Sequence, residues 1–252
     1  MRVQPGQTIA VWFSSGAASA VAAKRTLEMY GNICKVRVIN NPIKEEDPDN
    51  LRFLKDVEKW LGIEIEFALN PKYPNASATE VWEKRKFMSG VSGAPCTLEL
   101  KKEARYEWER NNHADWNVLG FTIDEIHRVK NFIEFENPNL LPVLVYDLLS
   151  KKDCFKIIQD AGIELPLSYR LGFPNANCRA CVKASSPEYW GHTKKHYPLE
   201  FEARAKQSRE IGAKLVRVKN KRIFLDELKD TDRGRPMKSM QIECGIFCEE
   251  KQ

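Results

Sequence analysis

Cysteines are the residues of this chain whose type and spacing point most directly to chemistry. Seven occur among the 252 residues, and an odd number in a chain of this length is not typical of a disulfide framework. Cys178 and Cys181 form a C-x-x-C pair in a stretch rich in Gly, Pro and Asn. Two thiolates at this spacing can bind one metal ion or cluster when further ligands converge on them. The candidates for those ligands are Cys96 and the tail residues Cys244 and Cys248.

The C-x-x-C spacing has a second explanation, a thioredoxin-like redox pair. That motif belongs at a helix N-terminus in a βαβ unit, which this stretch lacks. The five cysteines named above supply a four-thiolate site with one to spare, and both a [4Fe–4S] cluster and a structural Zn²⁺ satisfy that number. Cys34 and Cys154 fall in a predicted strand and at the start of a predicted helix, where we expect small buried side chains.

A second group of candidate residues, Ser14 to Ser19, follows the first predicted strand. Small residues let backbone N–H groups approach a ligand, and a helix N-terminus places partial positive charge at the same point. The hydroxyl groups add donors for phosphate or sulfate oxygens, although a tight turn without a ligand would have the same pattern. The loop is neither a Walker A sequence nor a G-x-G-x-x-G fingerprint. We predict an anion-binding loop whose contacts are Ser14, Ser15, Gly16, Ala17 and Ser19.

The elements that position these residues alternate between strand-like and helix-like segments. Apolar or β-branched runs predict strands at 8–13, 34–39, 63–69, 117–121 and 140–145. Helical periodicity predicts helices over 19–30 and 49–61, and Ser150 to Asp153 resemble a capping box before a helix over 154–161. This alternation is typical of an α/β fold with a parallel sheet flanked by helices.

The composition of the chain changes near residue 165. Gly, Pro and Asn then interrupt every long element, a helix is predicted over 199–211, a hairpin over 214–225 around Asn220, and an irregular tail follows. We therefore expect a nucleotide-binding α/β domain at 1–165 and a metal- or cluster-binding C-terminal segment at 166–252.

Overall composition limits the classes of function. The chain is 42% hydrophobic and 30% charged, as in a soluble globular protein, and its apolar runs are too short to span a bilayer. No targeting segment precedes the first predicted strand, so we expect a cytoplasmic protein without a membrane partner. The 40 Lys and Arg against 35 Asp and Glu give a net charge of +5. That charge suits a phosphate-bearing ligand but does not indicate a dedicated nucleic-acid binder.

Taken together, these motifs resemble the PAPS and APS reductases, the sulfonucleotide reductases of the adenine nucleotide alpha hydrolase or N-type ATP pyrophosphatase superfamily. The loop is similar to S-G-G-x-D-S, with Ser15 in place of the second residue and Ala18 in place of Asp. The Asp is usually assigned an activating role in ATP cleavage, and Ala18 has no functional group that could perform it. The stretch 172–181 resembles G-Y-P-S-I-G-C-x-P-C, and 96–101 resembles C-C-x-x-R-K with Thr97 and Leu100 as departures. The tail is similar to E-C-G-L-H, with Phe247 in place of His.

The resemblance implies a HUP-type fold that binds an adenine nucleotide, ATP or PAPS/APS, and a [4Fe–4S] cluster, with Zn²⁺ as the alternative metal. Cys96, Cys178 and Cys181 are then cluster ligands. Of the two tail cysteines, Cys244 is the catalytic nucleophile and Cys248 the fourth ligand, or the reverse.

The resemblance also implies further contacts with the nucleotide. Ser14 and Ser19 of the loop are additional catalytic candidates. In the superfamily the second strand presents its main chain to adenine, and the predicted strand over 34–39 corresponds to it. The resemblance therefore places the main chain of Val38 and Ile39 against adenine. The remaining contacts are Gly120 and Arg128 near the anionic end of the ligand and Lys101 as a source of positive charge. The acidic run 45–50 is expected to be a solvated loop, with Mg²⁺ bound to the nucleotide as the alternative.

Three functions follow from these features. The first is reduction of a sulfonucleotide by thiol attack from Cys244. The second is adenylation and sulfur insertion by a cluster-containing sulfurtransferase, as in thiolation of tRNA or phosphorothioation of DNA. The third is a non-catalytic nucleotide-binding subunit. We expect a homo-oligomer whose partners are the adenine nucleotide, a thiol or sulfur-donor protein and, for the second function, nucleic acid.

Overall fold

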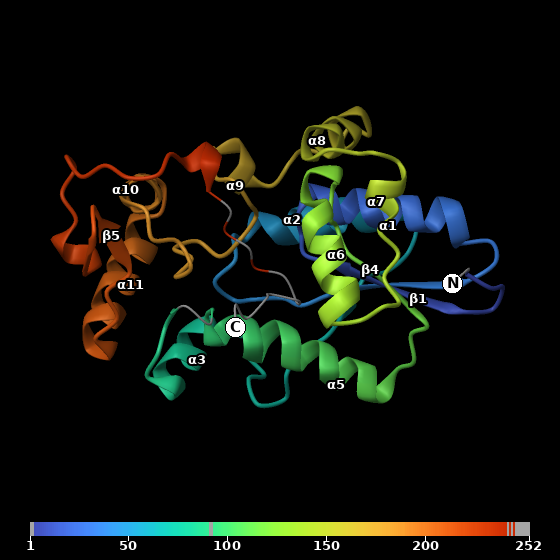
Figure 1. The fold of residues 1–252 in the computed structure, drawn as a ribbon, viewed down its shortest axis with the longest axis horizontal. Coiled ribbons are helices and arrows are strands. Elements are labelled where there is room, and N and C mark those ends of the chain that lie inside the picture. The colour runs from blue at the N-terminus through green and yellow to red at the C-terminus, as the bar shows by residue number, and fades with distance from the viewer. Residues whose placement is uncertain (1–2, 91–92, 241, 243, 245–252) are drawn as a thin grey trace. The chain divides into compact units, whose positions relative to one another are not determined.

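The computed structural model describes residues 3–90, 93–240, 242 and 244 (Figure 1). The chain forms two compact units, and each contains three separate segments of sequence. Unit 1 comprises Met1–Pro42, Pro48–Leu69 and Ala104–Leu167, and unit 2 comprises Ile43–Asp47, Asn70–Glu103 and Ser168–Gln252. The predicted boundary at residue 165 lies near the last of these junctions, but the sequence did not indicate that 43–47 and 70–103 belong with the C-terminal residues.

Unit 1 is built on a four-stranded parallel sheet in the order β3-β2-β1-β4. The strands are β1 (Thr8–Phe13), β2 (Lys35–Asn40), β3 (Glu66–Phe67) and β4 (Trp116–Val118). Val11 in β1 pairs with Val38 of β2 on one side and Val118 of β4 on the other. Residues 9–13 are buried, as expected for a central strand covered on both faces. The predicted α/β fold with a parallel sheet is confirmed.

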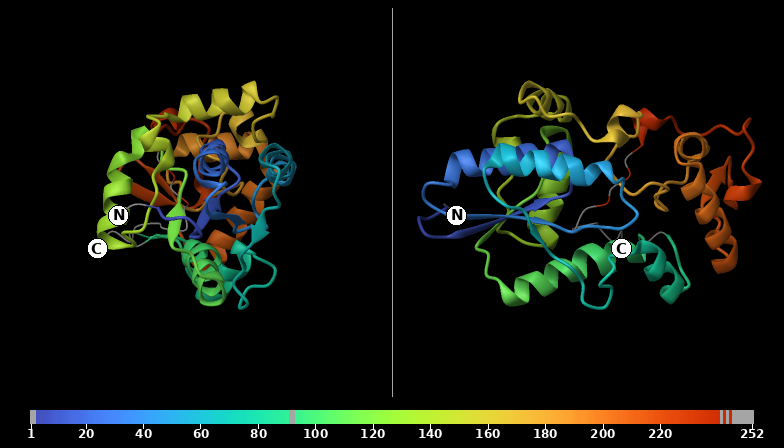
Figure 2. Two further views of the ribbon diagram at one scale, coloured as in Figure 1. Left: turned by 90° about the vertical axis from the view of Figure 1, so that its right-hand side faces the viewer. Right: turned by 180° about the vertical axis from the view of Figure 1, so that it is seen from behind.

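Helices cover both faces of this sheet (Figure 2). On one side lie α1 (Ala17–Tyr30), α2 (Asp49–Leu61) and α8 (Lys151–Asp160), and on the other lies α5 (Glu103–Asn111). Successive side chains of β1 point to opposite faces. Phe13 therefore packs near Phe53 of α2, with ring centroids 6.3 Å apart, whereas Trp12 meets Trp108 of α5 at 5.5 Å. A 3₁₀ turn (Ile123–Glu125), α6 (Ile126–Phe135) and α7 (Val143–Tyr146) complete the unit.

Local capping signals set several helix ends where the sequence indicated them. Gly62 ends α2 with a φ of 72°, a left-handed conformation that glycine adopts without steric cost. Ser150 and Asp153 form the predicted capping box, in which each side chain accepts a backbone N–H bond from the other residue. Because Ser150 is the N-cap, α8 begins at Lys151 rather than at the predicted Cys154.

The predicted strand over 140–145 is wrong. Leu140 makes only an isolated bridge with Asn117, and the chain then enters the short helix α7. Pro142 explains the difference, because it has no N–H for a sheet and its ring fixes φ at the start of the turn. Val143 and Leu144 are nevertheless fully buried. The apolar run therefore indicated burial, which periodicity alone cannot assign to a strand or a helix.

Unit 2 is helical and irregular. Its helices are α3 (Ala78–Arg85), α4 (Pro95–Thr97), α10 (Pro187–His196) and α11 (Pro198–Ile211), with α9 (Leu167–Arg170) at its boundary. A π-helical turn (Leu98–Lys102) joins α4 to α5, and 3₁₀ turns occur at Leu225–Glu227 and Met237–Ser239. The predicted hairpin around Asn220 is confirmed as β5 (Val216–Val218) and β6 (Lys221–Ile223). Among the described helices of both units, none is long and apolar enough to cross a membrane.

Candidate functional site

In unit 1 the candidate residues lie where the strand order of the sheet reverses. The chain runs from β1 outward to β2 and β3 and then returns to β4 on the other side of β1. Ligands of open parallel sheets bind outside the carboxyl ends of the strands at such a point. The loop Ser14 to Ser19 follows β1 and Gly120 follows β4, so the topology brings two predicted nucleotide contacts to one place.

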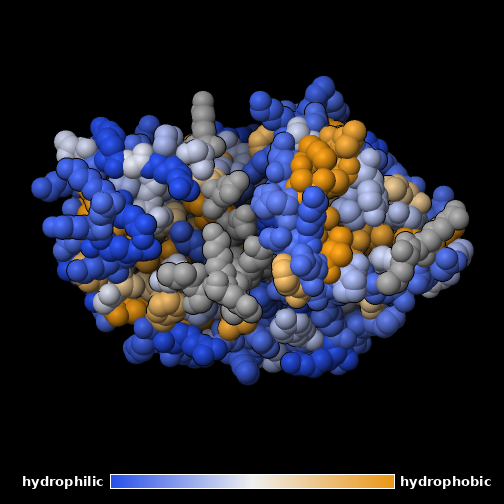
Figure 3. All heavy atoms as spheres, viewed as in Figure 1, coloured by the Kyte–Doolittle hydropathy of each residue, from blue (hydrophilic) through white to orange (hydrophobic). Residues whose placement is uncertain are grey.

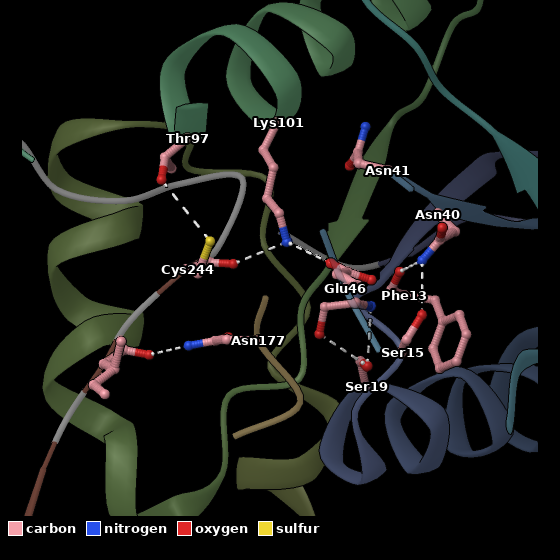
Figure 4. A network of polar contacts seen from close by, with 12 residues as sticks. Phe13, Ser15, Ser19, Asn40, Asn41, Glu46, Thr97, Lys101, Asn177 and Cys244 are labelled. Carbon is pink, nitrogen blue, oxygen red and sulfur yellow. Dashed lines mark hydrogen bonds and ion pairs between the residues drawn. The ribbon is translucent and has the colours of Figure 1, made fainter. Parts of the chain in front are cut away.

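The loop after β1 is closed by its own hydroxyl groups (Figure 4). The Ser14 N–H donates to Ser19 Oγ at 3.1 Å, and Ser19 Oγ donates to the Gly16 carbonyl at 2.9 Å. Gly16 is the N-cap of α1, has no side chain to cap the helix, and is followed by a first turn without acidic residues. The first N–H groups and the partial positive charge of α1 therefore suit an anion. Ser19 is buried and shapes the loop, whereas Ser14 is exposed.

Asn40, at the end of β2, fixes the other side of this loop. Its side-chain nitrogen donates to the Phe13 carbonyl at 2.8 Å and to Ser15 Oγ at 3.2 Å. Ser15 has a φ of 56°, a left-handed conformation that is costly for a residue with a Cβ atom. The two bonds from Asn40 hold that turn. The sequence reasoning missed Asn40, although a polar residue that ends an apolar strand was the available signal.

Gly120 packs directly against the start of α1. A Cβ atom at Gly120 would lie 2.7 Å from the backbone nitrogen of Ser19 and 2.9 Å from its Cα. Only glycine fits there without displacing the helix. The structure thus brings Gly120 and Ser19 side by side.

The other predicted nucleotide contacts of unit 1 have partners inside the unit. Val38 and Ile39 are buried, and their main chain pairs with β1. Arg128 of α6 forms an ion pair with Glu125 and lies over the ring of Phe121, with its guanidinium carbon 4.6 Å from the ring centroid. Contacts of these three residues with a nucleotide stay predictions.

In unit 2 the structure brings together the three predicted cluster ligands and Cys244. Cys96, Cys178 and Cys181 are buried in one hydrophobic core, and Cys244 is half-buried. Burial, and next the charge of Cys244, raise the pKa of Cys96 to about 12 and that of Cys181 to about 11. Burial, the Glu46 carboxylate and Cys244 raise the pKa of Cys178 well above its ordinary value. All three thiols therefore favour the neutral form unless positive charge is supplied.

These thiols are neighbours without forming a site for a single ion. Among the described residues, no three Cys, His, Asp or Glu side chains lie close enough to hold a metal ion. Zinc requires each of its thiolates about 2.3 Å from one ion. The thiolates of a [4Fe–4S] cluster each bind a different iron and stand farther apart. Cys34 and Cys154 belong to unit 1 and are buried, as predicted.

A buried cation accompanies Cys244 (Figure 4). Lys101 Nζ donates to the Cys244 carbonyl at 3.2 Å and lies 3.7 Å from the Glu46 carboxylate. Burial opposes the charge on Lys101, but Cys244 and Glu46 oppose that effect and raise its pKa above the ordinary value. Thr97, which stands where the related motif has a second Cys, places its Oγ1 3.9 Å from Cys244 Sγ. Lys101 therefore supplies the positive charge that thiolates at this position need.

Trp82 of α3 contributes an unpartnered buried donor. Its side chain is 1% exposed, and its indole N–H has no hydrogen-bond partner among the described residues. The indole is near enough to Cys96 to oppose the rise in the pKa of that thiol, without reaching hydrogen-bond geometry. The guanidinium carbon of Arg204 lies over the Trp82 ring, 3.9 Å from its centroid. A thiolate or an inorganic sulfide would satisfy this donor, so these residues fit an iron–sulfur cluster.

The acidic segment Glu45 to Asp47 is not the solvated loop that we expected. Glu45 accepts N–H bonds from the first two residues of α3, at 2.7 and 3.1 Å. Asp47 is buried and accepts a hydrogen bond from the Tyr197 hydroxyl at 2.7 Å. The Glu45 carbonyl accepts the N–H of Arg179, inside the C-x-x-C loop, at 3.0 Å. The segment therefore frames the thiol loop, and binding of Mg²⁺ stays a prediction.

Two amide side chains anchor the tail that carries Cys244. Asn175 and Asn177 both donate to the Ile242 carbonyl, at 3.0 and 2.9 Å. The sequence reasoning missed this role, because Asn in a Gly- and Pro-rich stretch indicates turns. Cys248, the alternative to Cys244 as ligand or nucleophile, lies outside the described residues.

Comparison with known proteins assigns the chain to no family. No protein-family model matches it, and no curated protein matches it. Among solved structures, it is similar to the U34-tRNA thiolase NcsA from Methanococcus maripaludis with its [4Fe–4S] cluster, at a TM-score of 0.44 and 13% sequence identity. The match covers 83% of this chain and 73% of that chain.

Proposed function

We propose that this chain is an iron–sulfur enzyme of the ATP pyrophosphatase and PAPS reductase superfamily that binds ATP, adenylates an acceptor and replaces an acceptor oxygen with sulfur. The observation that carries the proposal is that Cys244 lies near Cys96, Cys178 and Cys181. These four thiols come from three distant segments of the sequence. Cys96 and Cys178 are 82 positions apart (178 − 96). Four ligands satisfy a [4Fe–4S] cluster.

The position of Cys244 favours sulfur transfer over sulfonucleotide reduction. Its charge raises the pKa of each of the other three thiols, and its carbonyl is held by Lys101. These contacts support Cys244 as the fourth ligand rather than as a separate nucleophile. A reductase needs a thiol outside the cluster to attack sulfur. The four cysteines described in unit 2 are all in this group, so on this assignment a reductase would have to use Cys248.

The chemistry divides between the two groups of residues. The first N–H groups of α1 and the Ser14 hydroxyl bind the phosphates, and Gly120 allows close approach. An acceptor oxygen attacks the α-phosphorus of ATP and pyrophosphate leaves. A hydrosulfide ion then displaces AMP, so that sulfur takes the place of the acceptor oxygen, which leaves with AMP. When bound, the cluster would be held by these four thiolates, and release of the half-buried Cys244 would open one Lewis-acidic iron to the incoming sulfur. Lys101 and Trp82 would stabilise the thiolates by charge and hydrogen bonding.

Sulfonucleotide reduction is the second candidate, and Ala18 is the observation that favours it. Ala18 occupies the position of the activating Asp in the related loop and is half-buried. Cleavage of ATP then has no carboxylate at this position, whereas binding of PAPS or APS needs only the anion site. A nucleotide-binding subunit without catalysis is the third, and cytoplasmic location and homo-oligomerisation stay part of the proposal.

The test is metal content and spectrum after purification without oxygen. We expect four iron atoms and four sulfide ions per chain and absorbance at about 400 nm. Cys178→Ser should lose both, because an incomplete ligand set costs cluster binding and folding together. Cys154→Ser changes a buried thiol of unit 1 and should keep both. A colourless protein with one zinc per chain would refute the cluster.

Product analysis then separates the candidate reactions. Release of pyrophosphate from ATP supports adenylation, and release of sulfite from PAPS or APS supports reduction. Nucleotide binding with neither product identifies the non-catalytic subunit.

A further inference from the structure

The net positive charge of the chain is concentrated in one hairpin. The segment 214–222 carries five Lys and Arg and no Asp or Glu. The whole chain has a net charge of +5, so the remaining 35 Lys and Arg (40 − 5) balance the 35 Asp and Glu. The modest overall charge therefore conceals a strongly basic segment.

The hairpin presents these charges on a fixed support. Leu215 and Val216 are buried in the core of unit 2, while all five basic residues of the segment are exposed. The segment contains β5, the turn and the first two residues of β6, and Arg217 lies directly opposite Arg222. Within the described part of the chain, none of the five forms an ion pair with an acidic side chain. The hairpin is thus a basic surface whose charges have no acidic partner among the described residues, although Arg222 Nη1 donates to the Lys214 and Leu215 carbonyls, both at 3.4 Å.

This arrangement is unfavourable in the isolated protein. Like charges directly opposite each other destabilise an antiparallel pair. Partial desolvation of the exposed Arg222 side chain, and next the charge of Arg217, lower the pKa of Arg222. A polyanion lying on the hairpin would relieve the repulsion.

Hydrogen bonds connect the hairpin to the thiol loop. The Arg217 N–H donates to the Ser185 carbonyl at 2.7 Å. The adjacent Ser186 hydroxyl donates to the carbonyl of Arg235 at 2.8 Å, which places the main chain of a further exposed Arg beside the residue that follows Ser185. Ser185 follows Cys181 by four residues, a stretch that spans at most about 14 Å. A ligand on the hairpin therefore lies close to the thiols.

We infer that this basic surface binds the phosphate backbone of a nucleic acid; its residues are Lys214, Arg217, Lys219, Lys221, Arg222 and Arg235. Exposed Lys and Arg without acidic partners are the groups that contact phosphates in such complexes. The surface around β5 is strongly hydrophilic (Figure 3). No large hydrophobic side chain is exposed in 214–235, so the surface lacks the apolar anchors of a membrane-binding segment. That the bound nucleic acid is the sulfur acceptor rests on the proposed function, whereas its binding does not.

The experiment is fluorescence anisotropy with labelled RNA, single-stranded DNA and duplex DNA, each of about 20 nucleotides, at several salt concentrations. The wild-type chain should bind at least one of them with an affinity that falls as salt rises. The triple variant Arg217→Glu, Lys219→Glu, Lys221→Glu should bind at least about tenfold more weakly at low salt. Its salt dependence should fall by about two to three units of log–log slope. Glu at position 217 faces Arg222, so the variant should melt no lower than the wild type.

The control is the charge-matched variant Lys35→Glu, Lys130→Glu, Lys152→Glu, which changes three exposed lysines of unit 1. It should keep most of the affinity. Equal losses in both variants, absence of binding by the wild type, or tighter binding to vesicles of phosphatidylcholine and phosphatidylserine would overturn the inference. The preferred probe identifies RNA or DNA. Iron analysis of the same preparations separates nucleic-acid binding from the proposed iron–sulfur enzyme. If a protein without iron still binds nucleic acid through the hairpin, the cluster is refuted and the binding surface is not.

Discussion

Asn40 offers a direct test of whether the phosphate loop is shaped in advance of binding. Asn40→Ala removes the hydrogen bonds to the Phe13 carbonyl and to Ser15 Oγ, and both donor–acceptor pairs are buried. At about 1 kcal/mol for each bond, the free energy of unfolding should fall by about 2 kcal/mol. For a chain of this length that corresponds to a decrease in Tm of about 4–8 °C.

The same substitution should weaken nucleotide binding more than a substitution that lowers the stability equally but lies away from the loop. Ser15 has a φ of 56°, and without Asn40 its turn can relax to a conformation of lower strain. If the binding conformation loses the full contribution of the two bonds, the affinity for ATP falls by up to about 30-fold. Isothermal titration calorimetry measures that change, and thermal unfolding measures the stability.

Asn41→Ala is the matched control. The Asn41 side chain donates one buried hydrogen bond, to the Ala68 carbonyl at 3.1 Å, and among the described residues 14–19 of the loop it has no hydrogen-bond partner. Its loss should lower the stability by about half as much, since one bond replaces two, and leave the affinity for ATP unchanged. Wild-type affinity in Asn40→Ala, or an equal loss in both variants, would refute a loop held in shape by Asn40.

Two further predictions concern the start of α1 and the frame of the thiol loop. Gly120→Ala places a methyl group 2.7 Å from the backbone nitrogen of Ser19 and should cost about 1–3 kcal/mol in unfolding free energy as well as nucleotide affinity. Gly191→Ala, where no atom lies within 4 Å of the added Cβ, should not destabilise the protein, and equal effects of the two substitutions would contradict the packing. For Glu45, burial raises the pKa, but N–H bonds from the start of α3 and the Ser77 hydroxyl outweigh it and lower the pKa below the ordinary 4.5. The ionised Glu45 therefore stabilises the fold fully above the ordinary pKa of 4.5, and this stabilisation is lost as the pH falls through the lower pKa of the folded state. Glu45→Gln should accordingly flatten the decline in stability below about pH 5. Acid titrations of unfolding free energy check this, and parallel curves for wild type and variant would count against it.

The sequence by itself determined the elements whose signals are local. Each of these structures is predicted by a few consecutive residues, because capping and turn chemistry act over short distances. They are the apolar run of β1, the glycine after α2, the capping box at Ser150 and the hairpin around Asn220. The small, hydroxyl-rich loop after β1 was predictable for the same reason. The run over 140–145 shows the limit of such signals, because its hydrophobicity indicated burial and Pro142 decided against a strand.

Tertiary structure decided which distant groups meet. Residue types identified Cys96 and Cys244 as candidates, but only the packing of unit 2 brings them to Cys178 and places Lys101 between Cys244 and Glu46. An acidic segment is solvated or buried according to the donors that surround it, and those donors come from helices remote in sequence. The physical reason is that periodicity reports which face of an element is covered and not what covers it. Contacts between remote segments are selected by the free energy of the whole fold.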